Sequence, residues 1–136
     1  MKIRLIKFDD FYQKPVRAHY NDAGADVYAP RNVSIQKGAV KKIDLGFGVE
    51  IPDGFTGFIF PRSGLAAKGL VCELPPIDSG YRGEVHAVIS NHSGEFYQVK
   101  KGERIGQLVI VPCVLAEFCE VLGDVRGVGS FGSTGN

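Results

Sequence analysis

Residues 41–51, KKIDLGFGVEI, decide the fold class, because apolar and polar residues alternate along them. Every second residue is apolar, and these positions form one face of an extended chain: Ile43, Leu45, Phe47, Val49 and Ile51. A period of two is the pattern of a β-strand with one buried face, whereas an amphipathic helix repeats about every 3.6 residues. The stretch is therefore predicted to be a strand that packs against a core.

Similar short runs lie on both sides of this stretch, and the chain's 18 glycines and 7 prolines punctuate the whole sequence. The further runs cover residues 2–7, 26–29, 33–35, 55–60, 70–74, 84–90, 96–99, 104–111 and 115–122. Only residues 63–68 tolerate a short helix. Many short strands divided by turn residues are typical of a sandwich or barrel. The prediction is an all-β jelly-roll or β-clip domain over residues 1–122.

The size and charge of the chain limit its functions. Its 136 residues, 44% of them hydrophobic, suffice for one domain with a core. The net charge of +1 provides no global field that would attract polymeric nucleic acid or a membrane, so an anionic ligand must be held by a local pocket. Residues 1–7 break their apolar residues with charges, and a soluble, intracellular, cytoplasmic protein is expected.

The three cysteines, Cys72, Cys113 and Cys119, form neither a disulfide framework nor a closely spaced metal-binding pair. We expect buried or partly buried thiols in strands.

Residues 77–84, IDSGYRGE, place one carboxylate between an apolar residue and a turn glycine, with an aromatic ring three positions further on. Asp78 could meet a substrate at the mouth of a hairpin, and Tyr81 could offer a flat face to a ring or sugar. The alternative is an ordinary solvent-facing turn with a half-buried tyrosine.

Residues 61–68, PRSGLAAK, follow an apolar run and precede the helical turn. Here Arg62, Ser63 and the backbone at Gly64 could converge on one anion, for which phosphate is the expected ligand. The spacing is not that of a P-loop. The alternative is a capped helical turn with Ser63 near its N-terminus.

Two further polar residues stand among small or apolar neighbours. Asp26, in the stretch AGADVYA at residues 23–29, could orient an arginine or belong to a tight turn. Gln107 alternates with Ile105 and Val109, so its amide should share their strand face and needs a partner there. That partner is either a backbone group or a ligand phosphate.

Residues 123–136 are rich in glycine and serine and belong either to a disordered terminus or to a flexible arm that closes over a site. Arg126 could pair with phosphate and Phe131 could stack on a base, while Gly132 and Ser133 would let the backbone wrap closely. These residue types favour the arm.

Taken together and in this order, the motifs between residues 23 and 135 resemble those of the trimeric dUTPase family. The resemblance implies a jelly-roll fold and Mg²⁺-dependent hydrolysis of dUTP to dUMP and pyrophosphate, which limits the dUTP pool and supplies dUMP for dTMP synthesis. It also implies a homotrimer in which several subunits share each active site.

The resemblance assigns roles to individual residues. Asp78 would be the general base for water attack on the α-phosphorus, and Tyr81 would lie against the deoxyribose. The phosphate contacts would come from Arg62, Ser63, Gly64 and Gln107, with Asp26 as a supporting carboxylate. The closing arm would use Arg126, Phe131, Gly132, Ser133 and Thr134. Mg²⁺ would be held chiefly by triphosphate oxygens and water, without a protein metal site.

One segment departs from the family pattern. Residues 69–77 are shorter than in many members and lack the asparagine and glycine that line the uracil pocket. Uracil is then expected to be read mainly by backbone groups of this segment and of the strand after Tyr81. Two alternatives remain at this stage: a nucleotide-sensing binding protein with the same fold, and an enzyme related to dCTP deaminase.

Overall fold

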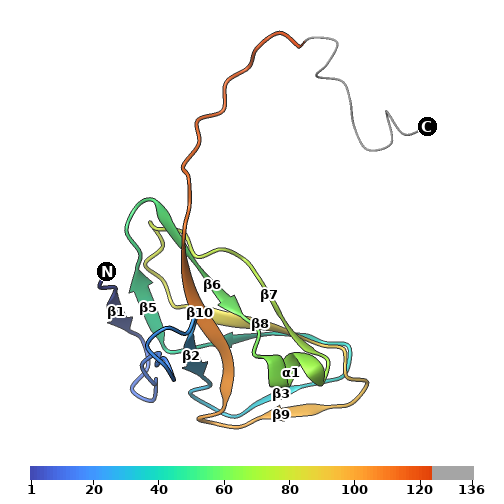
Figure 1. Cartoon of the computed structure of the whole chain (residues 1–136). Coiled ribbons are helices and arrows are strands. Elements are labelled where there is room, and N and C mark those ends of the chain that lie inside the picture. The colour runs from blue at the N-terminus through green and yellow to red at the C-terminus, as the bar shows by residue number, and fades with distance from the viewer. Residues whose placement is uncertain (124–136) are drawn as a thin grey trace, which may run out of the picture.

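The computed structural model describes residues 1–123 of the chain (Figure 1). Its strands are β1 (Arg4–Lys7), β2 (Ala25–Tyr28), β3 (Val33–Ile35), β4 (Val40–Asp44), β5 (Phe47–Glu50), β6 (Phe55–Phe60), β7 (Leu70–Glu73), β8 (His86–Asn91), β9 (Tyr97–Val99) and β10 (Arg104–Pro112). A single short helix within these residues, α1 (Ser63–Ala67), follows β6. The domain is an all-β jelly roll, as the sequence predicted, and most predicted strands agree with the observed ones to within two residues.

All strand pairs are antiparallel, and most join segments that are far apart in the sequence. The longest strand, β10, lies between β2 and β6, while β8 lies between β4 and β7. The remaining ladders are β1 with β5 and β3 with β9. Because β10 pairs with strands from the start and the middle of the chain, it brings their loops to one sheet.

The alternating stretch of residues 41–51 has the burial that was predicted but is two strands instead of one. Ile43, Leu45, Phe47, Val49 and Ile51 are all buried in the core. Between β4 and β5 the backbone turns at Gly46, which has a φ of +83°. A side chain there would also meet a neighbour, since an added Cβ would lie 2.7 Å from the Cβ of Tyr12. A glycine therefore allows one apolar row to serve two sheets.

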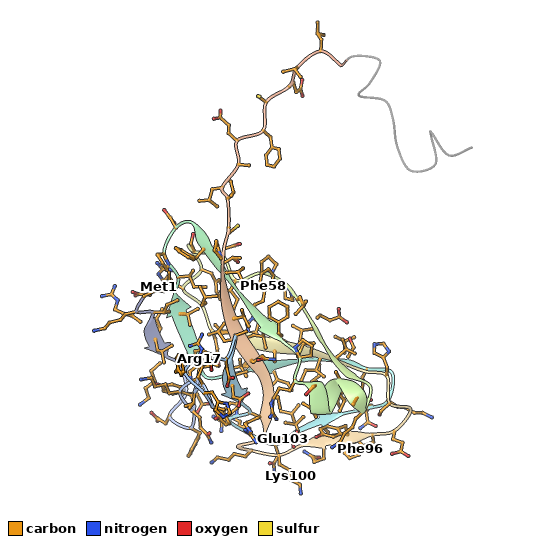
Figure 2. The ribbon with its side chains drawn as sticks, in the orientation of Figure 1. Met1, Arg17, Phe58, Phe96, Lys100 and Glu103 are labelled. Carbon is orange, nitrogen blue, oxygen red and sulfur yellow. The ribbon has the colours of Figure 1, made fainter. Side chains whose placement is uncertain are left out.

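The predicted strand at residues 115–122 is wrong. The last strand ends at Pro112, and the chain then extends away from the body (Figures 1 and 2). Five apolar side chains after Cys113 are 70% to 99% exposed: Val114, Leu115, Phe118, Val121 and Leu122. A strand exists only where another strand completes its hydrogen bonds, and within residues 1–123 no strand lies beside this segment.

The cysteine prediction is confirmed for Cys72, which is buried in β7. Burial, with a smaller contribution from Glu73, raises the pKa of this thiol to about 11, so the reactive thiolate is scarce near neutral pH. Cys113 is partly buried, as expected, but follows the last strand, and Cys119 is exposed outside any strand, so the expected strand position is wrong for both.

Within residues 1–123, no helix has the length and apolar character needed to cross a bilayer. The predicted boundary between a domain at residues 1–122 and an arm at residues 123–136 stays a prediction, because nearly all of the arm lies outside the described residues.

The turn at Gly46 provides a stability test. Gly46→Ala has two costs: a side chain on a left-handed backbone, and a clash with Tyr12. Gly38→Ala has only the backbone cost, because Gly38 has a φ of +74° and an added Cβ there meets nothing within 4 Å. We expect Gly38→Ala to lower the free energy of unfolding by about 1–2 kcal/mol, and Gly46→Ala to lower it by clearly more. Urea unfolding of both variants measures this, and equal losses would contradict the role given to Tyr12.

Candidate active site

The loop that carries Asp78 is anchored to β6 through its preceding residue. The amide of Ile77 donates to the carbonyl oxygen of Gly57 at 2.8 Å, and the amide of Gly57 donates back to Ile77 at 3.1 Å. The hydroxyl of Thr56 also donates to the Ile77 carbonyl oxygen at 2.9 Å. With Ile77 held in this way, Asp78 stands at a defined and exposed position beside the sheet.

The turn after Asp78 fixes the ring of Tyr81. The Tyr81 amide donates to the carbonyl oxygen of Asp78 at 3.1 Å, and its hydroxyl donates to the carbonyl oxygen of Glu84 at 2.7 Å. The ring lies against Gly83, where an added Cβ would approach the Tyr81 hydroxyl and come within 2.6 Å of its Cζ. The glycine is required because the ring occupies the space of a side chain. This packing and the exposure of Asp78 fit both sequence interpretations, a substrate contact and an ordinary solvent-facing turn.

A pocket of about 190 Å³ opens beside this turn. Its lining combines apolar residues, the two loop residues singled out in the sequence and the start of β8: Pro75, Pro76, Ile77, Asp78, Tyr81, Glu84, Val85 and His86. The pocket is smaller than the roughly 300–1,000 Å³ of sites for drug-sized ligands. It has room for a small ligand or for one part of a larger one.

A second group of polar residues lies where β10 pairs with β2 and β6. Gln107 of β10 pairs in register with Asp26 of β2 on one side and with Phe60 of β6 on the other. Its amide Nε2 donates to the carbonyl oxygen of Pro61 at 3.1 Å. The side chain lies over Gly24, where an added Cβ would be 2.5 Å from the Gln107 Oε1. Of the two partners left open by the sequence, the described residues therefore supply the backbone group.

A β-bulge between Arg104 and Gly106 interrupts the alternation of β10. Ile105 is buried in the core, whereas Gln107 and Val109 pair with Phe60 and Phe58 and are only partly buried. Simple alternation predicted that Ile105, Gln107 and Val109 share one strand face. Because of the bulge, Ile105 faces the core and only Gln107 and Val109 share a face.

Asp26 lies between two arginines. One carboxylate oxygen is 3.4 Å from the Nε of Arg62, and the other is 3.4 Å from a terminal nitrogen of Arg104. The expectation that this carboxylate orients an arginine is met. Two guanidinium groups and one carboxylate give this cluster a net positive charge. Because the chain as a whole is nearly neutral, an anion can be attracted only by a local cluster of this kind.

Arg62, Ser63 and Gly64 lie where β6 leads into α1. Arg62 is the N-cap residue of the helix, and no side chain caps it, so the alternative of a turn capped by Ser63 is not realised. Ser63 and Gly64 are exposed. An added Cβ at Gly64 would meet nothing within 4 Å among the described residues, so the chain's own packing does not explain this glycine.

The structure thus brings the predicted residues into two separate groups. Asp78 and Tyr81 line the 190 Å³ pocket, and none of Asp26, Arg62 and Gln107 belongs to that lining. The remaining predicted site residues, Arg126, Phe131, Gly132, Ser133 and Thr134, lie outside the described residues. No group of three or more metal-binding side chains occurs within residues 1–123.

Sequence reasoning missed two polar residues in or near these groups, Arg104 and His86. Arg104 binds Asp26, and His86 lines the pocket while its Nδ1 lies 3.1 Å from Asp44 Oδ1. A polar residue at the start of an apolar run was the available signal for Arg104 and for His86. Their partners lie 78 and 42 residues away, so only the strand pairing identifies them.

The fold places the chain in the class of all-β jelly-roll proteins, with candidate site residues on loops and on neighbouring strands. Comparison with known proteins defines it further. The dUTPase family model matches residues 12–135. The chain therefore belongs to the dUTPase family.

Individual relatives agree with this assignment. The chain is 43% identical over 141 residues to the deoxyuridine 5'-triphosphate nucleotidohydrolase of Nautilia profundicola, with 99% of each chain covered. It is 41% identical to the protein of the same name from Clostridium tetani, covering 99% of this chain and 96% of the relative.

Solved structures show the same fold. The dUTPase of Staphylococcus bacteriophage 80alpha with dUPNHPP superimposes with a TM-score of 0.86 at 29% identity and 99% coverage of both chains. A mutant dUTPase of phage phi11 of S. aureus, described with a structural Mg(II) ion, superimposes with a TM-score of 0.82 at 28% identity, covering 89% of this chain and 97% of the other.

Proposed function

We propose that this chain hydrolyses dUTP to dUMP and pyrophosphate. The observation that carries the proposal is the pocket in which an exposed carboxylate, Asp78, stands beside the fixed ring of Tyr81, in a chain of the dUTPase family. The relatives named above are nucleotidohydrolases, which favours hydrolysis over the sensing and deaminase alternatives. The cytoplasmic location expected from the sequence stays a prediction.

The chemistry assigned to Asp78 is proton abstraction. Its carboxylate accepts a proton from a water molecule, the water oxygen bonds to the α-phosphorus, and the bond from this phosphorus to the bridging oxygen breaks in line, releasing pyrophosphate. The anchoring of Ile77 to β6 supports this role, because a general base must be held within hydrogen-bond distance of the water.

The sugar contact is assigned to Tyr81. The Tyr81 ring is held against Gly83 and would leave little space beside the sugar of a bound nucleotide. A 2'-hydroxyl on that sugar would clash with the ring and would lose its hydrogen bonds to water. This favours deoxyribonucleotides over ribonucleotides.

The phosphate contacts are assigned to the second group. Arg62 provides a guanidinium that Asp26 already orients, and exposed Ser63 and Gly64 provide a hydroxyl and a backbone without a side chain. Gln107 would add an amide contact. The arm residues Arg126, Phe131, Gly132 and Ser133 are proposed to complete the phosphate and base contacts.

The donor set fits a magnesium ion carried by the substrate. Since residues 1–123 offer no cluster of metal-binding side chains, the ligands would be triphosphate oxygens and water, which Mg²⁺ prefers to a protein cage. Bound there, the ion would neutralise charge on the phosphates.

A homotrimer with shared sites would join the two groups. The pocket and the arginine cluster are separate within one chain, and a neighbouring copy could bring its own cluster to the pocket. Apolar surface for such contacts is present, since Phe58 and Phe60 are only partly buried and residues 114–122 expose large apolar side chains.

The proposed function is tested with a panel of nucleotides and the Asp78→Asn variant. The wild-type chain with Mg²⁺ should release pyrophosphate from dUTP far faster than from dCTP, dTTP or UTP. Asp78→Asn should lower kcat at least roughly 100-fold, because an amide cannot accept the proton. Binding of a nonhydrolysable dUTP analogue should persist. A variant with near-normal kcat would remove Asp78 from this role.

The packing of Tyr81 gives a second prediction. Gly83→Ala should displace the ring and lower kcat/KM for dUTP by roughly 10- to 100-fold, because small misplacements at a reaction centre are costly. The preference for dUTP over UTP should shrink as well. Gly80→Ala is the matched control in the same loop, since an added Cβ there meets nothing within 4 Å. Equal effects of the two exchanges would argue against the ring as the sugar contact.

The shared site is tested by mixing inactive variants. Asp78→Asn and Arg62→Ala should each be nearly inactive alone, yet trimers reassembled from both should regain activity, because some sites combine an intact Asp78 with an intact Arg62 from another subunit. Activity and mass are measured on the same samples. Mixed trimers without activity would show that each site is built from one chain.

A further inference from the structure

The residue that follows Asp78 makes a side-chain contact that the mechanism above does not use. The hydroxyl of Ser79 donates a hydrogen bond to the Asp53 Oδ1 at 2.9 Å. Asp53 lies in the turn between β5 and β6, 26 residues earlier in the chain. Neither residue belongs to the lining of the pocket beside Tyr81, so an effect on the reaction must pass through the loop that joins them to Asp78.

The turn that carries Asp53 is itself held in place. The amide of Phe55 donates to the carbonyl oxygen of Pro52 at 3.2 Å, which closes the turn. Gly54, whose φ is +87°, completes the turn before β6. Its carbonyl oxygen accepts the amide of Cys113 at 2.8 Å, directly after β10. The carboxylate on this turn therefore has a fixed position relative to β6 and β10.

Asp78 lies between two anchors that come from its neighbours in the sequence. On one side, the backbone of Ile77 exchanges two hydrogen bonds with Gly57 of β6. On the other side, the Ser79 hydroxyl is bound to Asp53. The exposed carboxylate of Asp78 is thus flanked on both sides by residues that are tied to β6 or to the turn before it.

The other hydrogen bonds of this loop are local. The Tyr81 amide donates to the Asp78 carbonyl oxygen, and the Tyr81 hydroxyl also donates within the loop. Arg82 donates from one terminal nitrogen to the carbonyl oxygens of Ser79 at 2.6 Å and of Tyr81 at 3.0 Å. These contacts fix the shape of the turn but not its position on the domain. Among the described residues, the two anchors supply the hydrogen bonds that join the turn to other elements before Val85.

Two anchors restrict the Asp78 carboxylate more than one does. A loop bound only through Ile77 could pivot about that residue, and the hydrogen bond of Ser79 removes this freedom on the far side of Asp78. Asp53 is a suitable acceptor, because hydrogen bonds to an ionised carboxylate are shorter and stronger than those between neutral groups. A displacement of about 1 Å at a reaction centre can lower the rate by roughly 100-fold.

We propose that Asp53 is a positioning residue for the reaction: through Ser79 it fixes the direction in which the Asp78 carboxylate meets the attacking water. This inference rests on the proposed function. Asp53 contacts neither the water nor the nucleotide in this arrangement, so its removal slows the chemical step and leaves substrate binding unchanged. A hydrogen bond with a purely structural role would instead change the stability of the domain and not kcat.

The test measures kcat, KM and urea unfolding for variants of this contact. Asp53→Ala and Ser79→Ala should each lower kcat for dUTP by roughly 5- to 10-fold, with KM within about twofold of the wild-type value. Asp53→Asn should keep most of kcat, because its amide oxygen can accept the same hydrogen bond. The matched control is Ser34→Ala, which removes a serine hydrogen bond of the same 2.9 Å length, to Gln98, and should leave kcat unchanged. Asp53→Ala and Ser34→Ala should unfold at similar urea concentrations.

Combined variants separate positioning from a structural role. In the Asp78→Asn background, adding Asp53→Ala should cause no further loss of kcat, because no base is left to position. Asp53→Ala combined with Ser79→Ala should be no slower than either variant alone. Losses that multiply in these combinations, a normal kcat in Asp53→Ala, or an equal loss in Ser34→Ala would overturn the inference while the proposed function stands. A wild-type chain that does not hydrolyse dUTP would instead contradict the proposed function, and the inference with it.

Discussion

The reciprocal hydrogen bonds between Gly57 and Ile77 are the constraint on which the rest of the site depends. They join a loop that contains two prolines to the middle of β6, and β6 is paired in turn with β10. The loop carboxylate therefore has a defined position relative to Gln107, which lies on the neighbouring strand and pairs with Phe60 at the end of β6. Residues 74–85 contain no strand of their own; this anchor holds their first half, and hydrogen bonds of Val85 to Phe47 and Leu45 hold their end.

Glycines determine the local geometry around this anchor, for two distinct reasons. At Gly46 the backbone itself requires a positive φ. At Gly24 and Gly83 the conformation is ordinary, and the glycine is needed because the side chain of Gln107 or Tyr81 occupies the space of a Cβ. Gly64 belongs to neither class within the described residues, which fits a position that a ligand or another copy approaches.

The fold was largely predictable from the sequence, because the period of two in residues 41–51 and its neighbours reports burial directly. The break at Gly46 could not be predicted, because one continuous strand and two strands in different sheets can show the same alternation of apolar and polar residues. The strand predicted at residues 115–122 failed because alternation shows which residues could pair and not whether a partner is present. Local motifs singled out Asp78, Tyr81, Arg62 and Gln107 as candidate site residues, and these roles stay predictions. The pairs Asp26–Arg104 and Asp44–His86 depend on strand register and could not be read from the sequence.

The division of the site residues into two groups has a consequence for how the protein behaves in a cell. In the proposed trimer, a subunit that separates loses the cover over its apolar segment and the complementary half of its site in one event. Folding, solubility and turnover are then linked through mass action, so the specific activity per chain falls at low expression levels and levels off once association is complete. The amount of catalyst would thus rise more steeply than the amount of polypeptide, giving a cell a threshold in enzyme dosage without a regulatory ligand.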